Sequence, residues 1–343
     1  MRLLVTGGCG FIGSNFICRI LQNGSKYEVV NLDKLTYCGN PENLRGVEEH
    51  PQYTFVHSDI AELKTVERVL RQGFDAVVNF AAETHVDRSI HDAAPFLRSN
   101  ILGVHALLEG ARSFSVPLFI QISTDEVYGS APKGVSFKEN DALDPGSPYS
   151  ASKCAADHLV HAYANTFGLP AIVLRCTNNY GPYQFPEKFI PLAIANALED
   201  RPIPVYGDGQ QERDWLYVGD YCAAIETVLK RGKVGEIYNV ASGKQRTNLD
   251  VLRALLRLLG KSESLIRFVQ DRPGHDRRYC IDNAKIQREL GWRAETNFES
   301  GIEKTIRWYL EHRDWVENVR SGAYREYYDL HYGEGIHVIP KAA

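Results

Sequence analysis

The stretch Arg2-Leu3-Leu4-Val5-Thr6-Gly7-Gly8-Cys9-Gly10-Phe11-Ile12-Gly13 decides the fold. Its first five residues form a short, largely apolar run, which predicts a buried strand. Three glycines follow with the spacing Gly7-x-x-Gly10-x-x-Gly13, and apolar residues then recur at helical intervals from Phe11 to Gln22. A glycine turn between a strand and a helix is typical of dinucleotide-binding folds, because the backbone can approach a pyrophosphate at the helix N-terminus.

Acidic and small residues follow the next predicted strands. Asp33 comes directly after the strand predicted for Glu28 to Leu32, twenty residues beyond the last glycine of the turn. A carboxylate at this place accepts hydrogen bonds from the adenosine ribose and repels a 2′-phosphate, which favours NAD over NADP. Asp59, after the third strand, is placed to hold the adenine amino group. Ala81 and Ala82, after the fourth, leave room for a cofactor against the backbone.

Strands and helices alternate through the first half of the chain. This alternation predicts repeated βαβ units, and therefore an α/β fold of the Rossmann type with a doubly wound parallel sheet. The expected strands are Arg2–Thr6, Glu28–Leu32, Thr54–His57, Ala76–Phe80, Leu118–Ile122 and Ala171–Leu174. The expected helices are Phe11–Gln22, Leu63–Arg71, Asn100–Arg112 and Tyr149–Thr166.

The pattern changes after Arg175, where the chain becomes rich in Pro, Tyr, Gly and charge. We expect a smaller, discontinuous α/β domain of residues 178–216 and 243–331. The NAD-binding domain then comprises residues 1–177 and 217–242, and residues 332–343 form a tail. Further elements are expected at Phe189–Glu199, Asp220–Lys230, Leu249–Leu259 with Asn248 as its cap, Asn283–Leu290 and Phe298–Leu310 (helices), and at Glu236–Ala241 (a strand).

Composition excludes several classes of protein. Of 343 residues, 44% are apolar and 24% charged, as in ordinary globular proteins. The net charge of −4 and the lack of a basic block argue against nucleic-acid binding. No apolar run reaches the roughly 18 residues of a membrane helix. The seven cysteines include no Cys-x-x-Cys pair, and the histidines show no ligand spacing. We therefore expect free thiols in a reducing cytoplasm and no metal.

Two groups of polar residues are candidates for catalysis. Thr124, Asp125 and Glu126 directly follow a predicted strand, and ligands of open parallel sheets sit outside the carboxyl ends of their strands. Tyr149 and Lys153 lie four residues apart and so share one face of a helix. We expect the lysine ammonium to lower the pKa of the phenol, which makes Tyr149 a base toward a hydroxyl group.

The neighbouring carboxylates Asp125 and Glu126 suggest acid–base chemistry of their own. Two carboxyl groups in a poorly solvated site cannot both ionise easily, so their pKa values separate and one stays protonated. Neighbours in a regular strand point to opposite faces of a sheet. The two side chains can therefore cooperate only if the backbone bends at this point.

The glycine turn, Asp33 and Tyr149-x-x-x-Lys153 resemble the extended short-chain dehydrogenase/reductase family. Four longer motifs make the resemblance more specific, to the dTDP-glucose 4,6-dehydratases of its nucleotide-sugar branch. They are Ala81-Ala-Glu-Thr-His-Val-Asp-Arg-Ser89, Ser123-Thr-Asp-Glu-Val-Tyr-Gly129, Asn178-Asn-Tyr-Gly-Pro-Tyr183 and Asp271-Arg-Pro-Gly-His-Asp-Arg-Arg-Tyr279. The similarity extends to about Leu310, and Thr-Asp-Glu is its most specific part.

The resemblance implies a carbon–oxygen lyase of deoxysugar biosynthesis. Tyr149 would remove the C4 hydroxyl proton, assisted by Thr124, while hydride passes to NAD. Glu126 would then abstract the C5 proton and Asp125 would protonate the departing C6 hydroxyl. Hydride return to C6 would give dTDP-4-keto-6-deoxyglucose. The family is also expected to be homodimeric, through helices near Asn100–Arg112 and Tyr149–Thr166.

The resemblance also assigns residues to the two ligands. Lys153 would hold the nicotinamide ribose. The implied cofactor contacts are Gly7, Gly10, Phe11, Ile12, Gly13, Asp33, Lys34, Leu35, Thr36, Asp59, Ile60, Phe80, Ala81, Ala82, Ser99, Tyr149, Lys153 and Asn179. The implied nucleotide-sugar contacts are Thr84, Thr124, Asn178, Glu187, Lys188, Phe189, Leu192, Pro204, Val205, Tyr206, Arg213, Asn248, Arg272 and His275.

Three alternatives remain open from the sequence. A nucleotide-sugar 4-epimerase on the same fold would need Thr124, Tyr149 and Lys153, but it leaves the Asp125-Glu126 pair unexplained. A 4,6-dehydratase of a UDP, GDP or CDP sugar would use the same catalytic residues. A non-catalytic dinucleotide-binding sensor would lack one or more catalytic side chains, and none is missing here.

Overall fold

The computed structural model describes residues 1–22 and 26–321. The tail expected at 332–343, and the last ten residues of the expected second domain, lie outside the described residues. No helix in the described part of the chain has the length and apolar character needed to cross a membrane. All seven cysteines are free thiols.

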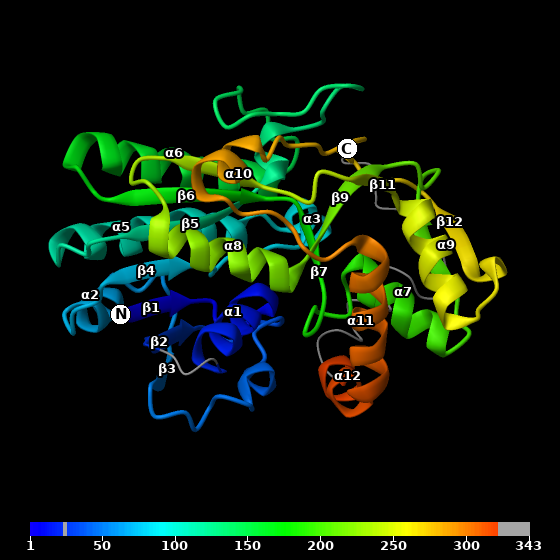
Figure 1. The fold of residues 1–343 in the computed structure, drawn as a ribbon, viewed down its shortest axis with the longest axis horizontal. Coiled ribbons are helices and arrows are strands. Elements are labelled where there is room, and N and C mark those ends of the chain that lie inside the picture. Colours follow the sequence, from blue (N-terminus) through cyan, green and yellow to red (C-terminus); the bar gives the residue numbers. More distant parts are fainter. Residues whose placement is uncertain (23–25, 322–343) are drawn as a thin grey trace.

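A seven-stranded sheet forms the larger part of the molecule (Figure 1). All of its strands are parallel, in the order β10-β6-β5-β4-β1-β2-β3. This confirms the predicted doubly wound sheet. The strands are β1 (Arg2–Thr6), β2 (Glu28–Asp33), β3 (Tyr53–His57), β4 (Ala76–Asn79), β5 (Phe119–Thr124), β6 (Ala171–Cys176) and β10 (Ile237–Val240). The strand order reverses between β1 and β4, so a crevice is expected outside their carboxyl ends.

Helices cover both faces of this sheet, which explains why its central strands β4, β5 and β6 are buried along their whole length. One face packs on α1 (Phe11–Gln22), α8 (Val218–Arg231) and α10 (Ala284–Leu290). The other packs on α2 (Leu63–Leu70), α5 (Val104–Ser113) and α6 (Pro148–Phe167). The helix expected to begin at Asn100 is longer: a π-helical segment, η2 (Leu97–Gly103), leads into α5, preceded by the short α3 (Val86–His91) and α4 (Ala94–Phe96).

Two small sheets and four helices form a second layer at one end of the large sheet (Figure 1). The strands are β7 (Asn178–Tyr180), β9 (Glu212–Tyr217) and β11 (Gln245–Thr247) in one sheet, and β8 (Ile203–Tyr206) and β12 (Ile266–Val269) in the other. The helices α7 (Phe189–Leu198), α9 (Asn248–Leu259), α11 (Phe298–Glu311) and α12 (Arg313–Arg320) surround a separate apolar core. The sequence predicted three of these helices, but not α12 or the strands, which are short and carry many polar residues.

Three single-turn 3₁₀ helices join these elements: η1 (Pro41–Leu44), η3 (Asp125–Tyr128) and η4 (Glu263–Leu265). One expectation about helix capping was wrong. The N-cap of α9 is Thr247, whose hydroxyl accepts a hydrogen bond from the Asp250 backbone N–H at 3.0 Å. Asn248 is instead the first residue of the helix, so its side chain is free to face a pocket.

Candidate active site

The glycine turn lies where β1 runs into α1 and leaves no room for side chains. Gly7 has φ +70°, and a Cβ there would stand 2.6 Å from the backbone nitrogen of Ala81. A Cβ on Gly13 would stand 2.4 Å from the Gly7 carbonyl oxygen. The turn therefore exposes bare backbone at a helix N-terminus, the environment that binds a diphosphate.

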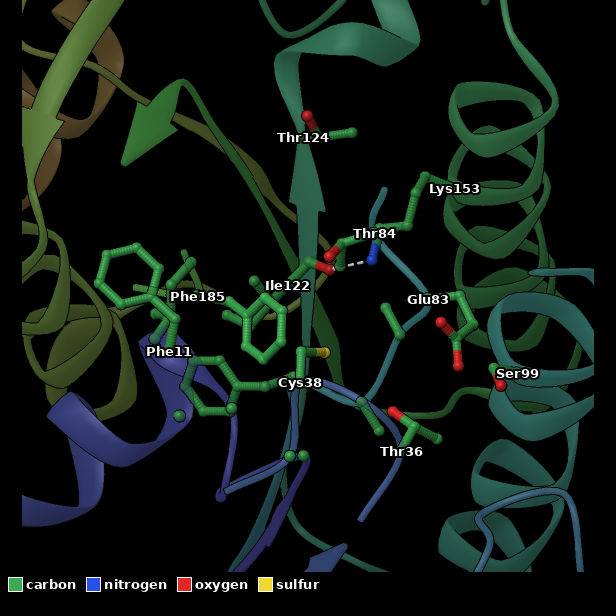
Figure 2. Close-up of a pocket in the computed structure, with 18 of the residues that line it drawn as sticks. Phe11, Thr36, Cys38, Glu83, Thr84, Ser99, Ile122, Thr124, Lys153 and Phe185 are labelled. Carbon is green, nitrogen blue, oxygen red and sulfur yellow. Dashed lines mark hydrogen bonds between the residues drawn. The ribbon is translucent and has the colours of Figure 1, made fainter. Parts of the chain in front are cut away.

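A pocket extends from this turn along the carboxyl ends of the strands (Figure 2). Every predicted cofactor contact except Leu35 lines this pocket. Leu35 packs its side chain against the core beneath, while its backbone N–H donates to Asp33 Oδ1 at 2.8 Å. The other oxygen of Asp33 accepts from the backbone N–H of Cys9 at 2.9 Å, so Asp33 is fixed beside the turn.

Asp59 stands at the far end of the same pocket, and two cations hold it there. Lys34 Nζ and the Arg98 guanidinium lie 2.9 and 3.1 Å from its Oδ2. Burial opposes ionisation of Asp59, but the Ala61 backbone N–H and Lys34 outweigh it and lower the pKa. The Asp59 carboxyl is therefore an ionised hydrogen-bond acceptor at neutral pH.

The backbone bends directly after β5, as cooperation between the two acids requires. Thr124 caps η3 by accepting a hydrogen bond from the Glu126 backbone N–H at 3.3 Å. The single turn of η3 brings both carboxyl side chains to the wall of the pocket. Asp125 is only 3% exposed, so its carboxyl group has little contact with solvent.

Burial determines the protonation of this pair. Loss of solvent raises the pKa of Asp125 to about 8, and the neighbouring Glu126 contributes to the rise. Burial raises the pKa of Glu126 as well, while Arg272 and Arg213 oppose that rise by favouring its ionised form. The expected separation of roles follows: Asp125 keeps a proton at neutral pH, and Glu126 is the partner that nearby cations help to ionise.

The expected effect of Lys153 on Tyr149 is wrong for this structure. Burial and the charge of Glu126 raise the pKa of Tyr149 well above its ordinary value, and a hydrogen bond with Thr124 opposes this rise. Lys153 Nζ instead donates to the Ile122 carbonyl oxygen at 2.6 Å (Figure 2). Both side chains still line the pocket, but in this arrangement the ammonium is bound to backbone.

A second pocket adjoins the first and contains most of the predicted substrate contacts. Thr84, Asn178, Glu187, Lys188, Phe189, Leu192, Pro204, Tyr206, Arg213, Asn248, Arg272 and His275 all line it. Thr124 lines the first pocket only. Val205 belongs to neither: it is 2% exposed in the core of the second layer. Alternation along β8 turns Pro204 and Tyr206 toward the pocket and Val205 away from it, so this prediction was wrong.

The second pocket is lined by two arginines, Arg213 and Arg272, that hydrogen bonds hold in place. Arg272 donates to Asp87 Oδ1 at 2.9 Å, and the Tyr206 hydroxyl donates to Oδ2 of the same carboxyl at 3.0 Å. Arg213 donates to the backbone carbonyls of Glu212 and Asp276, both at 2.8 Å. Burial and the charge of Arg272 lower the pKa of His275 to about 4, which leaves the imidazole neutral.

Six buried side-chain polar atoms of the second pocket lack a hydrogen-bond partner within the part of the chain that the structure describes. They are Asn178 Oδ1, Asn179 Oδ1, Gln184 Oε1, Glu187 Oε1, Trp215 Nε1 and Arg272 Nε. A buried polar group without a partner is costly, so these atoms are suited to bind a polar ligand. Glu126, Asn178 and Lys188 line both pockets. A molecule in the second pocket would thus meet the acid–base pair at the point where the two cavities join.

Comparison with known proteins identifies the family. A model of the GDP-mannose 4,6 dehydratase family matches residues 4–305. The dTDP-glucose 4,6-dehydratase of Shigella flexneri is 49% identical, over 97% of this chain and 99% of that protein. The crystal structure of dTDP-glucose 4,6-dehydratase DesIV from Streptomyces venezuelae, with NAD bound, shares 47% identity at a TM-score of 0.91, over 93% of this chain and 100% of that one.

The chain belongs to the dTDP-glucose 4,6-dehydratase branch of the extended short-chain dehydrogenase/reductase family. More distant structures have other activities. The UDP-glucose 4-epimerase of Thermus thermophilus shares 33% identity at a TM-score of 0.84, over 91% of this chain and 100% of that one. The fold is thus common to dehydratases and epimerases. The sequence identity of this chain to the two dehydratases is higher than its identity to the epimerase.

Sequence reasoning gave no role to two residues of this dehydratase site. Asp87 holds Arg272 and Tyr206, as described above. The Tyr279 hydroxyl lies 3.3 Å from Glu126 Oε2 and donates to Asp276 Oδ2 at 2.8 Å. Both residues belong to motifs that carry the family resemblance. Their contacts cross 119 to 185 residues of chain, so only the fold could reveal the partners.

Proposed function

We propose that this protein is an NAD-dependent dTDP-glucose 4,6-dehydratase that produces dTDP-4-keto-6-deoxyglucose. The observation that carries the proposal is the position of Asp125 and Glu126: the buried Asp125 and the partly buried Glu126 lie on the wall of the NAD-type pocket, and Glu126 also lines the adjoining pocket with Arg213 and Arg272. A 4-epimerase has no use for this pair. The names of relatives that match nearly the full chain support the same activity.

The cofactor pocket fits a dinucleotide. Its bare glycine turn suits the diphosphate, and Asp33 suits the adenosine ribose. When bound, NAD⁺ accepts a hydride from C4 of the sugar and later returns it to C6. Tyr149, with Thr124 beside it, would take the C4 hydroxyl proton. Burial raises the pKa of Tyr149 and so favours the protonated phenol. The positive charge of the oxidised nicotinamide would act in the opposite direction and favour the phenolate.

Elimination of water would then use the two carboxyl groups in opposite protonation states. Glu126 would remove the proton from C5, which the ketone at C4 has made acidic. Asp125, whose pKa of about 8 keeps it protonated, would donate to the departing C6 hydroxyl. Both steps take place in a buried site, where a general acid and a general base each contribute about 10²–10⁴-fold to the rate.

The second pocket would hold the dTDP group. Arg213 and Arg272 would bind the diphosphate, because a guanidinium is planar, always charged and matched to phosphate oxygens. Phe189, Leu192 and Tyr206 would surround the base. We further propose that residues 1–177 and 217–242 form the NAD-binding domain, against which α10 also packs, and that residues 178–216 and the rest of 243–331 form the nucleotide-sugar domain.

The assembly and location of the protein are also proposals. The exposed leucines of the η2–α5 surface, Leu97 and Leu102 at 48% and 57% exposure, support a homodimer formed through α5 and α6. The free thiols support the reducing environment of the cytoplasm.

One experiment tests the function directly. The purified protein is offered dTDP-, UDP-, GDP- and CDP-glucose in turn, and the 4-keto product is followed by its alkaline near-ultraviolet absorbance. We expect rapid ketone formation from dTDP-glucose. Isomerised hexose without ketone would indicate an epimerase, and inactivity on all four would contradict the proposal. A clear preference for another nucleotide would keep the chemistry and change the substrate.

A further inference from the structure

A chain of buried hydrogen bonds joins α12 to the glycine turn. The indole N–H of Trp315, in α12, donates to Asn43 Oδ1 at 2.9 Å. The side-chain amide of Asn43, in η1, donates in turn to the backbone carbonyl of Cys9 at 2.9 Å. Trp315 and Asn43 are 7% and 2% exposed. These hydrogen bonds are therefore shielded from water, and the first of them connects Trp315 and Asn43, which are 272 residues apart.

The backbone of Cys9, within the glycine turn, takes part in several hydrogen bonds. Its carbonyl also accepts a hydrogen bond from the Asn40 backbone N–H at 3.0 Å. Its own N–H donates to Asp33 Oδ2 at 2.9 Å. Cys9 thus links the proposed ribose-binding acid on one side to η1 on the other. Any movement of η1 would shift Cys9 and the adjoining Gly10, where the phosphate-facing backbone begins.

Helix α12 is anchored in the other layer of the molecule. The ring of Trp315 packs against those of Trp308 and Tyr183, with centroids 5.0 and 6.1 Å apart. Arg320, near the end of the helix, forms an ion pair with Glu199 at the end of α7. Trp315 is therefore held in the apolar core of the second layer, and its indole N–H donates to Asn43, which lies beside the glycine turn.

We propose that Trp315 and Asn43 are positioning residues that hold the glycine turn in its dinucleotide-binding shape. Through them, the C-terminal helix of the second layer would slow the release of the cofactor. The inference rests on the proposed function, in which the hydride must return to the same substrate and the cofactor must therefore stay bound. Neither residue lines the cofactor pocket, so both act through Cys9.

The size of the effect follows from the loss of one buried hydrogen bond. Trp315→Phe keeps an aromatic ring but leaves Asn43 Oδ1 without its donor, which makes η1 less firmly fixed. Asn15 provides a second connection, because its amide donates to Phe11 O at 2.8 Å and to Pro182 O at 3.0 Å. We therefore expect NAD to dissociate roughly three to ten times faster, rather than to lose binding altogether.

The test measures exchange of bound NAD for radiolabelled NAD, without turnover. The variants are Trp315→Phe, Asn43→Leu and the double variant. Trp292→Phe is the matched control, because its buried indole N–H also donates a hydrogen bond, in this case to the backbone carbonyl of Asp220 at 3.2 Å, away from the turn. Hydrogen–deuterium exchange of the peptide that contains residues 7–14 reports directly on the turn, and it remains informative should Asn43→Leu fold poorly.

We expect faster NAD exchange in both single variants, no further acceleration in the double variant, and wild-type exchange in Trp292→Phe. The turn peptide should exchange deuterium faster in Trp315→Phe. Wild-type NAD exchange in Trp315→Phe, or additive effects in the double variant, would overturn the proposal. A wild-type protein that binds no NAD would instead overturn the proposed function, so the two failures are distinguishable.

Discussion

The carboxyl group of Asp125 keeps its proton because the fold removes water from it and places a second carboxyl next to it in sequence. Its pKa of about 8 makes Asp125 an acid at neutral pH. Burial raises the pKa of the partly exposed Glu126 as well, but the charges of Arg272 and Arg213 favour its ionised form. Two neighbouring residues with the same functional group thus differ in how readily they ionise, and their proposed opposite tasks give the first two predictions.

Dehydration should fail at alkaline pH. As the pH rises through about 8, Asp125 loses the proton that it donates to the leaving hydroxyl, so the rate of ketone formation should fall. Asp125→Asn should slow elimination by about 10²–10⁴-fold and should abolish this alkaline limb, because an amide does not ionise. The pH profile of single-turnover ketone formation checks this. An unchanged limb in Asp125→Asn would assign the limb to another group.

Glu126→Gln should separate oxidation from elimination. The amide cannot accept the C5 proton, while Tyr149 and Lys153 remain in place for the first step. We expect the reduced cofactor to accumulate and C5 to stop exchanging with solvent. The measurement is incorporation of deuterium from D₂O at C5, followed by NMR or mass spectrometry. Normal incorporation in this variant would remove Glu126 from the role of base.

At the scale of elements, the long periodic segments were predictable and the short ones were not. The helices α1 and α6 follow from apolar spacing, and β1 and β5 from apolar runs. The single turn of η3 has no such pattern, because its shape depends on the Thr124 cap and on burial. The strand β8 was not predicted either, and this is why Val205 was wrongly assigned to the substrate pocket.

The junction between β1 and α1 supplies a prediction of its own. Gly13→Ala would place a methyl group 2.4 Å from the Gly7 carbonyl, so the helix would have to move away from the turn. We expect NAD to bind about 10–100 times more weakly. Calorimetric titration with NAD measures the change. Gly46→Ala is the control, since the nearest atom to its added Cβ lies 3.9 Å away; equal affinities in the two variants would contradict the argument.

At the scale of the whole molecule, two separately packed cores meet at one active site. The large sheet and its helices form the cofactor pocket, and the second layer supplies Arg213, Tyr206 and Arg272. The buried contacts of Asp87 with Tyr206 and Arg272 join the two parts beside the acid–base pair. The site is therefore complete only when both layers are folded against each other.

The proposed dimer gives a prediction at this scale. Leu102→Glu places a charge on the exposed leucine surface beside α5, and burying that charge in an interface would be costly. We expect the variant to sediment as a monomer in analytical ultracentrifugation while the wild type sediments as a dimer. Val234→Glu is the control, because Val234 is equally exposed at 56% but precedes β10. A dimeric Leu102→Glu would place the interface elsewhere.

The sequence alone was sufficient for the Rossmann-type sheet, for the glycine turn and for the place of Asp33 in the same pocket, because these depend on local spacing and on apolar periodicity. Only the tertiary structure decided that Asp125 holds its proton, that Lys153 binds the Ile122 carbonyl, and that Asp87 and Tyr279 support the site. Those properties depend on burial and on contacts between distant parts of the chain, which no local pattern encodes.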